Sequence, residues 1–448
     1  MYIHLYKWGL LLGLLLGQVA ALFAQTDENF ARAERAYGFF IAEQGDSIHA
    51  MLTAELQQKL SPQVFAGMMG QMERQVGKLQ SRAEWKKDRA QGITIYYCDL
   101  TFERYRLRFL TSFDVDGGMN TIRLAPISEP STAAPVVYDK QKMTEREITV
   151  GVPHFPLPGT LTLPLGQPPH PVVILVHGSG ANDRDETLGP NKPFRDLAWE
   201  LAKRGIATIR YEKRAKVYGA ALPEGRELDY DTEAVDDVLT AIELAKQLPE
   251  IAPDSIYVAG HSLGAVVAPR IAERAPAGDL AGIILIAGTP RPLEELVVEQ
   301  SVYLASLTDS SAATREQLAT LKREAENTKL LGTPRFNDTI PLLLGQPRSY
   351  WLFINRYKPL EVARKLTLPI LILQGERDYQ VTMQDYGLWR FVLIRNKNVS
   401  FKSYPKLNHL LQEGTGKSTP FEYNHASPVP GYVTDDLTTF IRTLRLID

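Results

Sequence analysis

Between about residue 145 and the C-terminus, short apolar runs alternate with amphipathic segments long enough to form helices. A strand buried on both faces of a sheet appears in a sequence as a continuous apolar run bounded by helix and strand breakers. Repeated alternation of strands and helices is typical of a doubly wound, mostly parallel α/β sheet. The predicted strands are 171–176, 206–210, 254–259, 282–287, 369–373 and 399–404, after a leading hairpin at 146–152 and 159–163. Helices are expected at 194–203 and 231–248.

The alternation stops over about residues 290–366. Helical periodicity there predicts helices at 293–307 and 312–328, and an aromatic cluster follows at 350–354. An insertion of this size between core strands predicts a helical cap over an active site at the sheet edge. Some of its apolar residues are expected to line an acyl or aryl pocket, although most are expected to pack on the core. Residues 414–431 predict a second loop that borders this pocket.

Residues 27–128 follow a different pattern and predict a separate α+β domain. Apolar positions recur at helical spacing from Phe30 to Ile41, and Ser61-Pro62 opens a second helical region. A pattern of period two then predicts antiparallel strands at 93–97, 105–109 and 121–124, with a turn at 116–118.

This order of elements is similar to the cone-shaped folds related to nuclear transport factor 2. The N-terminal domain is expected to support a homodimer, to position the catalytic domain or to contribute to substrate binding. Residues 129–144 predict a linker, and residues 145–448 the catalytic domain.

The first 24 residues have the pattern of a secretory signal peptide. Lys7 precedes an apolar run from Trp8 to Phe23 that ends in small residues, and cleavage is expected after Ala24. An uncleaved anchor helix is the alternative, although the run is short for a membrane span. Export to a bacterial periplasm or to the exterior is expected, with no stable membrane insertion after processing. The single cysteine, Cys98, excludes an intramolecular disulfide.

The composition limits the possible classes of function. The chain has 448 residues, 44% of them hydrophobic, which suffices for two domains with sizeable cores. A formal net charge of −2 does not indicate binding to nucleic acid or to an anionic membrane. The sequence contains no His-Glu-x-x-His zinc motif and no glycine-rich dinucleotide loop, so neither a metal nor another cofactor is expected.

The motif Gly260-His261-Ser262-Leu263-Gly264 lies between a predicted strand and an apolar helix start. A serine on such a sharp turn is held out at the mouth of a sheet, and the small flanking glycines let the turn close. Ser262 is therefore the candidate nucleophile. Because a serine hydroxyl reacts poorly at neutral pH, the chemistry also needs a base, an orienting acid and an oxyanion-binding site.

An acid and a base follow the nucleophile in the order Ser, Asp, His that this type of turn requires. Asp378 follows the predicted strand 369–373, and His409 follows the predicted strand 399–404. Both are therefore expected at the carboxyl edge of the sheet, where the sites of open α/β sheets lie. Asp378 is predicted to orient His409, which accepts the Ser262 proton. The alternatives are Glu376 and Asp385 for the acid and His425 for the base.

The loop after the predicted strand 171–176 reads His177-Gly178-Ser179-Gly180. Backbone N–H groups of such a loop bind the oxyanion together with the N–H of the residue after the nucleophile. The predicted donors are Ser179, with Gly180 as its alternative, and Leu263. An ordinary glycine turn is the simpler interpretation of the loop. His177 and His261 are expected to be structural because each belongs to a turn motif.

Six separated segments resemble, in the same order, bacterial carboxylesterases of the serine-aminopeptidase-like (S33-like) branch of the α/β-hydrolase superfamily that carry a small extra N-terminal domain. The segments are 178–186, 189–194, 210–214, 374–381, 407–410 and 418–423. The resemblance implies an α/β-hydrolase fold and a serine esterase acting on small-molecule acyl esters, with Ser262, Asp378 and His409 as its triad. It leaves the natural substrate open.

Two other functions remain as alternatives. A serine exopeptidase for short peptides uses the same fold and triad. It would need a carboxylate for the substrate amine, for which Glu294, Glu295 and Glu299 of the cap are candidates. A non-catalytic envelope binding protein on a hydrolase scaffold is the alternative outside the enzymes.

Overall fold

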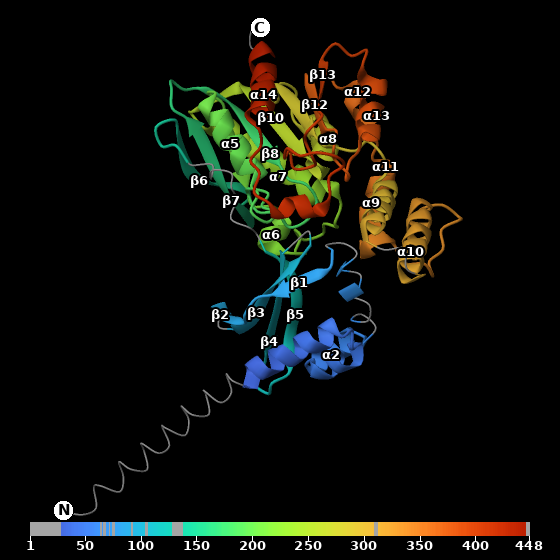
Figure 1. Cartoon of the computed structure of the whole chain (residues 1–448). Coiled ribbons are helices and arrows are strands. Elements are labelled where there is room, and N and C mark those ends of the chain that lie inside the picture. Colours follow the sequence, from blue (N-terminus) through green and yellow to red (C-terminus); the bar gives the residue numbers. More distant parts are fainter. Residues whose placement is uncertain are drawn as a thin grey trace, which may run out of the picture. The chain divides into compact units, whose positions relative to one another are not determined.

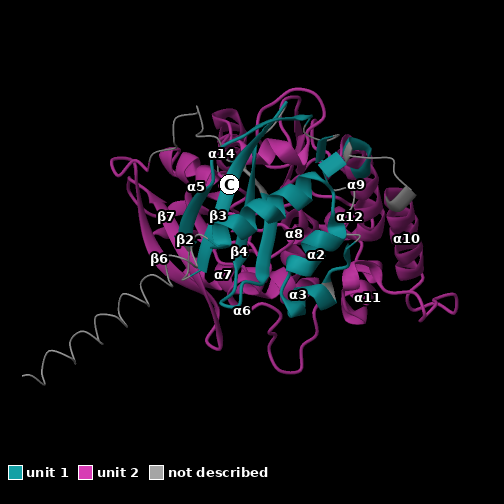
Figure 2. Ribbon diagram, turned by 60° about the horizontal axis from the view of Figure 1, so that its bottom comes forward, with its two compact units in different colours: residues 1–127, 305–310 teal, residues 128–304, 311–448 magenta. Residues whose placement is uncertain are grey.

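The computed structural model describes residues 28–62, 65, 69–70, 72–73, 77–90, 93–103, 106–127, 138–308 and 312–444. The chain divides into two compact units, which Figure 2 shows in different colours. The N-terminal unit comprises residues 1–127 and 305–310, and the large unit comprises residues 128–304 and 311–448. The predicted signal peptide, most of the predicted linker and part of the helical region expected after Pro62 lie outside the described residues.

A single sheet of eight strands forms the centre of the large unit (Figure 1). Its strands are β6 (Met143–Val152), β7 (Phe155–Pro164), β8 (His170–Val176), β9 (Ala207–Tyr211), β10 (Ile251–His261), β11 (Gly282–Ile286), β12 (Ile370–Gly375) and β13 (Val399–Tyr404). Their order across the sheet is β13-β12-β11-β10-β8-β9-β7-β6. The strands from β13 to β9 in this order run parallel, and the hairpin β6–β7 is antiparallel. The predicted hairpin and the predicted parallel sheet are both confirmed.

Helices cover both faces of this sheet because its central strands are buried on both sides. Alternate residues of a strand point to opposite faces. Val172 and Ile174 of β8 belong to the core cluster that includes α7 (Asp236–Gln247) and α8 (Leu263–Arg274). Val173 and Leu175 belong to the cluster that includes α5 (Pro193–Lys203) and α14 (Gly431–Leu444). The fold is therefore the doubly wound arrangement expected from the sequence.

Shorter helices complete the large unit. They are α6 (Arg214–Tyr218), α13 (Met383–Leu393), the π-helix η2 (Asp231–Val235) and the 3-10 helix η4 (Pro420–Asn424). The predicted helix 231–248 thus begins as a π-helix before it continues as α7.

The segment between β11 and β12 is helical, as the loss of strand–helix alternation predicts. It contains α9 (Leu293–Thr308), α10 (Ala312–Lys329), the 3-10 helix η3 (Leu343–Gly345), α11 (Arg348–Arg356) and α12 (Pro359–Lys365). The aromatic cluster lies on α11, where Tyr350 and Trp351 are buried.

The N-terminal unit is an α+β fold. A helix at 28–41 is followed by α2 (Gly45–Met51), α3 (Ala54–Lys59) and the strands β1 (Leu79–Arg82), β2 (Lys86–Ala90), β3 (Ile93–Phe102), β4 (Arg106–Phe113) and β5 (Met119–Pro126). All of the strand pairs are antiparallel. Phe40 of the first helix packs against Phe109 of β4, with 5.3 Å between ring centroids. The elements α2, α3, β1 and β2 were not predicted, because they contain few apolar residues from which a period could be read.

The register of the parallel strands places the site. Gly260 of β10 pairs with Val176 of β8, and His261 pairs with Ile286 of β11. The loops that follow β8, β10, β12 and β13 therefore leave the sheet at its common carboxyl edge.

Candidate active site

Ser262 occupies a strained turn between β10 and α8. Its backbone has φ 53° and ψ −114°, a conformation that non-glycine residues rarely adopt. A Cβ added to Gly260 would lie 2.1 Å from the carbonyl oxygen of Gly264, and one added to Gly264 would lie 2.1 Å from that of Val176. Both clashes are with backbone atoms that cannot rotate away. The two glycines of the motif are thus sterically required, and Ser262 is held at the start of the helix.

Asp378 and His409 are bonded to each other in the loops after β12 and β13. His409 Nδ1 lies 2.6 Å from Asp378 Oδ2, and both side chains are buried. The second carboxylate oxygen of Asp378 accepts hydrogen bonds from the N–H groups of Gln380 (2.7 Å) and Val381 (3.1 Å). These bonds keep Asp378 in one orientation. A proton on His409 Nδ1 leaves the lone pair of Nε2 free to accept another.

The alternative acids and base lie elsewhere. Glu376 is exposed and accepts a hydrogen bond from Ser403. Asp385 belongs to the capping box of α13 and binds Arg291 at 2.8 Å. His425 is exposed in the segment that follows η4. The structure thus brings together the residues first predicted and separates the alternatives from them.

The loop after β8 lies directly against the serine turn. A Cβ added to Gly178 would be 3.2 Å from Ser262 Cβ. The neighbouring Ser179 and the first residue of α8, Leu263, line the same cavity as Ser262 and His409. A residue in the first turn of a helix has a backbone N–H without an acceptor inside the helix. In the described chain, no hydrogen bond joins Ser262 Oγ to His409, a bond that often tightens only when substrate is bound.

A buried carboxylate links this loop to the serine turn, a role that the sequence analysis did not assign to it. Glu186 Oε1 accepts the Gly178 N–H at 2.6 Å, and Glu186 Oε2 lies 2.9 Å from His261 Nδ1. The other ring nitrogen of His261 lies 2.9 Å from the His409 carbonyl oxygen. Burial opposes the charged form of both side chains, but their opposite charges and the hydrogen bonds around them together outweigh it. The pKa of His261 is therefore raised, and the pKa of Glu186 is lowered.

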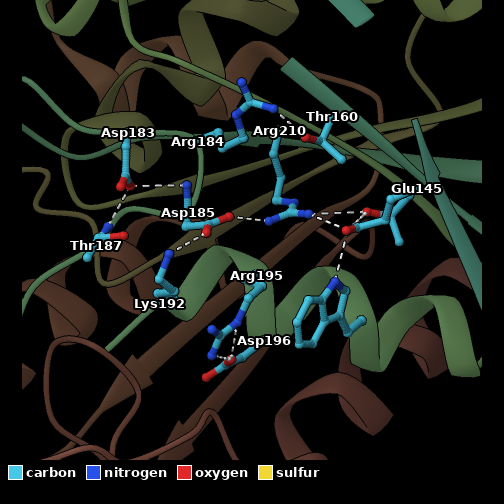
Figure 3. Close-up of polar contacts among 12 residues, drawn as sticks. Glu145, Thr160, Asp183, Arg184, Asp185, Thr187, Lys192, Arg195, Asp196 and Arg210 are labelled. Carbon is cyan, nitrogen blue, oxygen red and sulfur yellow. Dashed lines mark hydrogen bonds and ion pairs between the residues drawn. The ribbon is translucent and has the colours of Figure 1, made fainter. Parts of the chain in front are cut away.

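Ion pairs fix the segment that carries Glu186, as Figure 3 shows. Arg210 of β9 is buried and binds both Asp185 and, on β6, Glu145. Lys192 binds Asp185 as well, at 2.9 Å. Since Glu186 itself has a φ of 53°, the neighbouring contacts are what hold it in a conformation that is unfavourable for a glutamate.

His177, at the end of β8, is a buried structural residue. Its ring packs against Phe194 and Tyr211, with centroid separations of 5.2 and 5.3 Å. Burial lowers the pKa of His177 to about 4, so its ring is neutral at pH 7.

A cavity of about 1100 Å³ opens at the serine turn. Residues of α9, α11 and the loop before α12 form much of its wall. Its apolar and aromatic lining includes Val266, Leu293, Leu296, Val297, Tyr230, Tyr350, Ile354 and Tyr357. The prediction that residues 414–431 border the pocket is wrong, because no residue of that described segment lines the cavity. Arg377 instead binds the segment through the Gly416 carbonyl oxygen (2.7 Å) and Glu422 (2.5 Å).

The described residues contain neither a metal-binding group nor a membrane-spanning helix. No group of three or more His, Cys, Asp or Glu side chains there could hold a metal ion. No helix in that part of the chain has both the length and the apolar character needed to cross a membrane.

A parallel sheet with a serine turn, an Asp–His pair and a helical insertion defines an α/β-hydrolase. The family model described as "Serine aminopeptidase, S33" matches residues 167–416, and the chain belongs to this family. A second model, for a protein of unknown function (DUF3887), matches residues 33–121.

Individual relatives are also similar. Esterase EstD from Thermotoga maritima is 34% identical over 428 residues, which cover 95% of each chain. Among solved structures, Est1E from Butyrivibrio proteoclasticus matches with a TM-score of 0.43 and 17% identity, covering 67% of this chain and 99% of its own. A Pyrococcus furiosus esterase matches with a TM-score of 0.43 and 14% identity, covering 71% and 97%.

Proposed function

We propose that this protein is a serine carboxylesterase that works through an acyl-enzyme intermediate. One observation carries the proposal: Ser262 on its strained turn and His409, bonded to Asp378 at 2.6 Å, line the same cavity. The 34% identity to Esterase EstD over nearly the whole chain supports ester hydrolysis as the activity.

In the proposed reaction, His409 Nε2 accepts the proton of Ser262 as Oγ attacks the ester carbonyl. Asp378 keeps the imidazole in the required tautomer and stabilises the imidazolium. The backbone N–H groups of Ser179 and Leu263 bind the oxyanion of the tetrahedral intermediate. His409 then gives its proton to the leaving alcohol. Water activated by His409 finally releases the acid from Ser262.

The lining of the cavity favours small-molecule esters with apolar parts. Leucine, valine and tyrosine side chains from the cap face the space next to Ser262. Such a wall binds an acyl chain or an aryl group through burial of apolar surface, at about 25 cal/mol per Å².

The structure gives less support to an exopeptidase. Glu295 binds Lys329 at 2.7 Å, and Glu299 binds Arg291 at 2.6 Å. Glu294 is buried, and burial raises its pKa, which disfavours the carboxylate that an amine would need. None of these three residues lines the cavity.

The test compares ester and amide substrates. The mature chain is assayed with p-nitrophenyl acetate, butyrate and octanoate and with amino-acid p-nitroanilides, beside Ser262→Ala. We expect ester turnover that falls by about 10⁴-fold or more in Ser262→Ala, as for removal of a serine nucleophile in general. Hydrolysis of anilides alone would indicate the exopeptidase, and folded protein without turnover of any substrate would indicate a binding protein.

We also propose that the protein is exported after cleavage behind Ala24, on the basis of the apolar run from Trp8 to Phe23. The intact mass of the protein recovered from the cell envelope and medium tests this. A mass that includes residues 1–24, or recovery from the cytoplasm alone, would contradict it. The proposed homodimer through the N-terminal domain is tested by light scattering of the mature chain.

A further inference from the structure

Gly178 is held on both sides by buried charged groups. Its N–H donates to Glu186 Oε1 at 2.6 Å, and its carbonyl oxygen accepts from Lys213 Nζ at 2.8 Å. Lys213 lies just before α6, and its side chain is only 2% exposed. Its other partner is Glu233, at 2.7 Å. Asn182 Nδ2 also donates to the Gly178 carbonyl oxygen, at 3.1 Å.

The position of the Lys213 ammonium group determines the direction of the Ser179 N–H. The carbonyl of Gly178 and the N–H of Ser179 belong to one planar trans peptide unit, so they point in opposite directions. Fixing the carbonyl on Lys213 therefore aims the Ser179 N–H away from Lys213. Ser179 lines the cavity beside Ser262, where a substrate carbonyl would lie.

The charge of Lys213 adds an electronic effect to this orientation. A cation at a carbonyl oxygen polarises the amide and makes its N–H a stronger donor, because hydrogen bonds in a chain strengthen one another. The effect is greatest where water is excluded, as it is around Lys213. Burying an ammonium group is costly, and a neutral donor would satisfy the carbonyl equally well as a hydrogen bond. Apart from its pairing with Glu233, the cation is therefore not needed to satisfy this carbonyl.

We propose that Lys213 is a positioning residue that orients and polarises the Gly178–Ser179 peptide so that the Ser179 N–H stabilises the oxyanion. The inference rests on the proposed esterase function. Lys213 itself does not line the cavity and acts only through this peptide.

The experiment uses the mature chain and three variants. Lys213→Met removes the charge, and Lys213→Arg keeps it. The double variant Lys213→Met/Glu233→Gln also removes the carboxylate that would otherwise be left unpaired. Lys216→Met, at an exposed lysine three residues further on in α6, is the matched control. For each, kcat and KM for p-nitrophenyl butyrate are measured beside the inhibition constant of n-butylboronic acid, which forms a tetrahedral, oxyanion-like adduct on a catalytic serine.

We expect kcat to fall by about 10- to 100-fold in both variants that lack the lysine, which is less than complete loss of one oxyanion donor. Boronate binding should weaken by a similar factor, KM should stay within about two-fold, and Lys213→Arg should recover part of kcat. A merely structural lysine would not move kcat and boronate binding together at constant KM. If the double variant folds and retains kcat, or loses kcat without weaker boronate binding, the role of Lys213 is overturned. If the parent neither turns over esters nor binds the boronate, the esterase proposal fails together with it.

Discussion

The serine turn and the loop after β8 lie side by side but are built in different ways. The serine turn is fixed by steric exclusion at its two glycines, since a Cβ on Gly260 would meet the Gly264 carbonyl oxygen and one on Gly264 the Val176 carbonyl oxygen of β8, each at 2.1 Å. The loop after β8 is fixed by charged side chains from farther along the chain. Glu186 and Lys213 bind the two sides of Gly178 from positions 8 and 35 residues away in the chain.

This difference explains why the glycines that shape the serine turn are visible in a short motif, whereas the charged residues that hold the loop after β8 are not. A steric requirement leaves a pattern of glycines around the serine. Ion pairs between distant parts of the chain leave no such pattern. Their residues are scattered along the sequence, and each one resembles an ordinary charged surface residue. The two regions should therefore respond differently to substitution.

The largest effect is expected from adding a methyl group to the serine turn. In Gly264→Ala the new Cβ would meet the Val176 carbonyl oxygen, so both β8 and the turn must shift. We expect esterase activity to fall by about 10³-fold and the free energy of unfolding to fall by about 1–3 kcal/mol, as for overpacked cores. Kinetics and urea unfolding measure the two effects. Gly387→Ala in α13, where a Cβ meets nothing within 4 Å, should have neither effect. Wild-type activity in Gly264→Ala would contradict the steric account.

A smaller effect is expected from removing the charge of the buried Glu186, which links Gly178 to His261. Glu186→Gln keeps an oxygen for the Gly178 N–H but removes the charge opposite His261. We expect a loss of about ten-fold in kcat with little change in KM, because the loop stays in place but less rigidly. Glu224→Gln, at an exposed position, is the control. Activity within two-fold of the parent would mean that the charge of Glu186 does not support the site.

The smallest effect on turnover, but a clear one on stability, is expected for His177. Its folded pKa of about 4 lies below the value near 6.5 of an unfolded histidine. Between these values the unfolded chain binds the extra proton, so His177 lowers the stability as the pH falls from about 6.5 to 4. The full cost is about 3 kcal/mol.

Urea unfolding at pH 7 and pH 5 measures this contribution. His177→Phe keeps a ring against Phe194 and Tyr211 but has no proton to bind. It should lose less stability than the parent between the two pH values. His425→Gln, at an exposed position, should behave as the parent does. An equal loss in His177→Phe and the parent would contradict the prediction.

The sequence predicted the strands of the large sheet and the positions of Ser262, Asp378 and His409 because each follows an apolar run or a glycine motif. It did not predict Glu186, Lys213 or Arg210 as neighbours of the site. Their contacts depend on which loops the register of β8, β9 and β10 brings together, and no local pattern encodes this. The π-helical start of the helix 231–248 was also missed, since a π turn has no distinct residue signature.

The central claim is that Ser262 is the nucleophile and that His409 activates it. The most direct measurement is the intact mass of the mature chain after reaction with a fluorophosphonate, followed by peptide mapping, for the parent and for His409→Ala. We expect one phosphonate group for each chain, attached to Ser262, with a rate that falls by several orders of magnitude in His409→Ala. Attachment to another residue, or ester hydrolysis that continues in a chain fully labelled at Ser262, would contradict this claim.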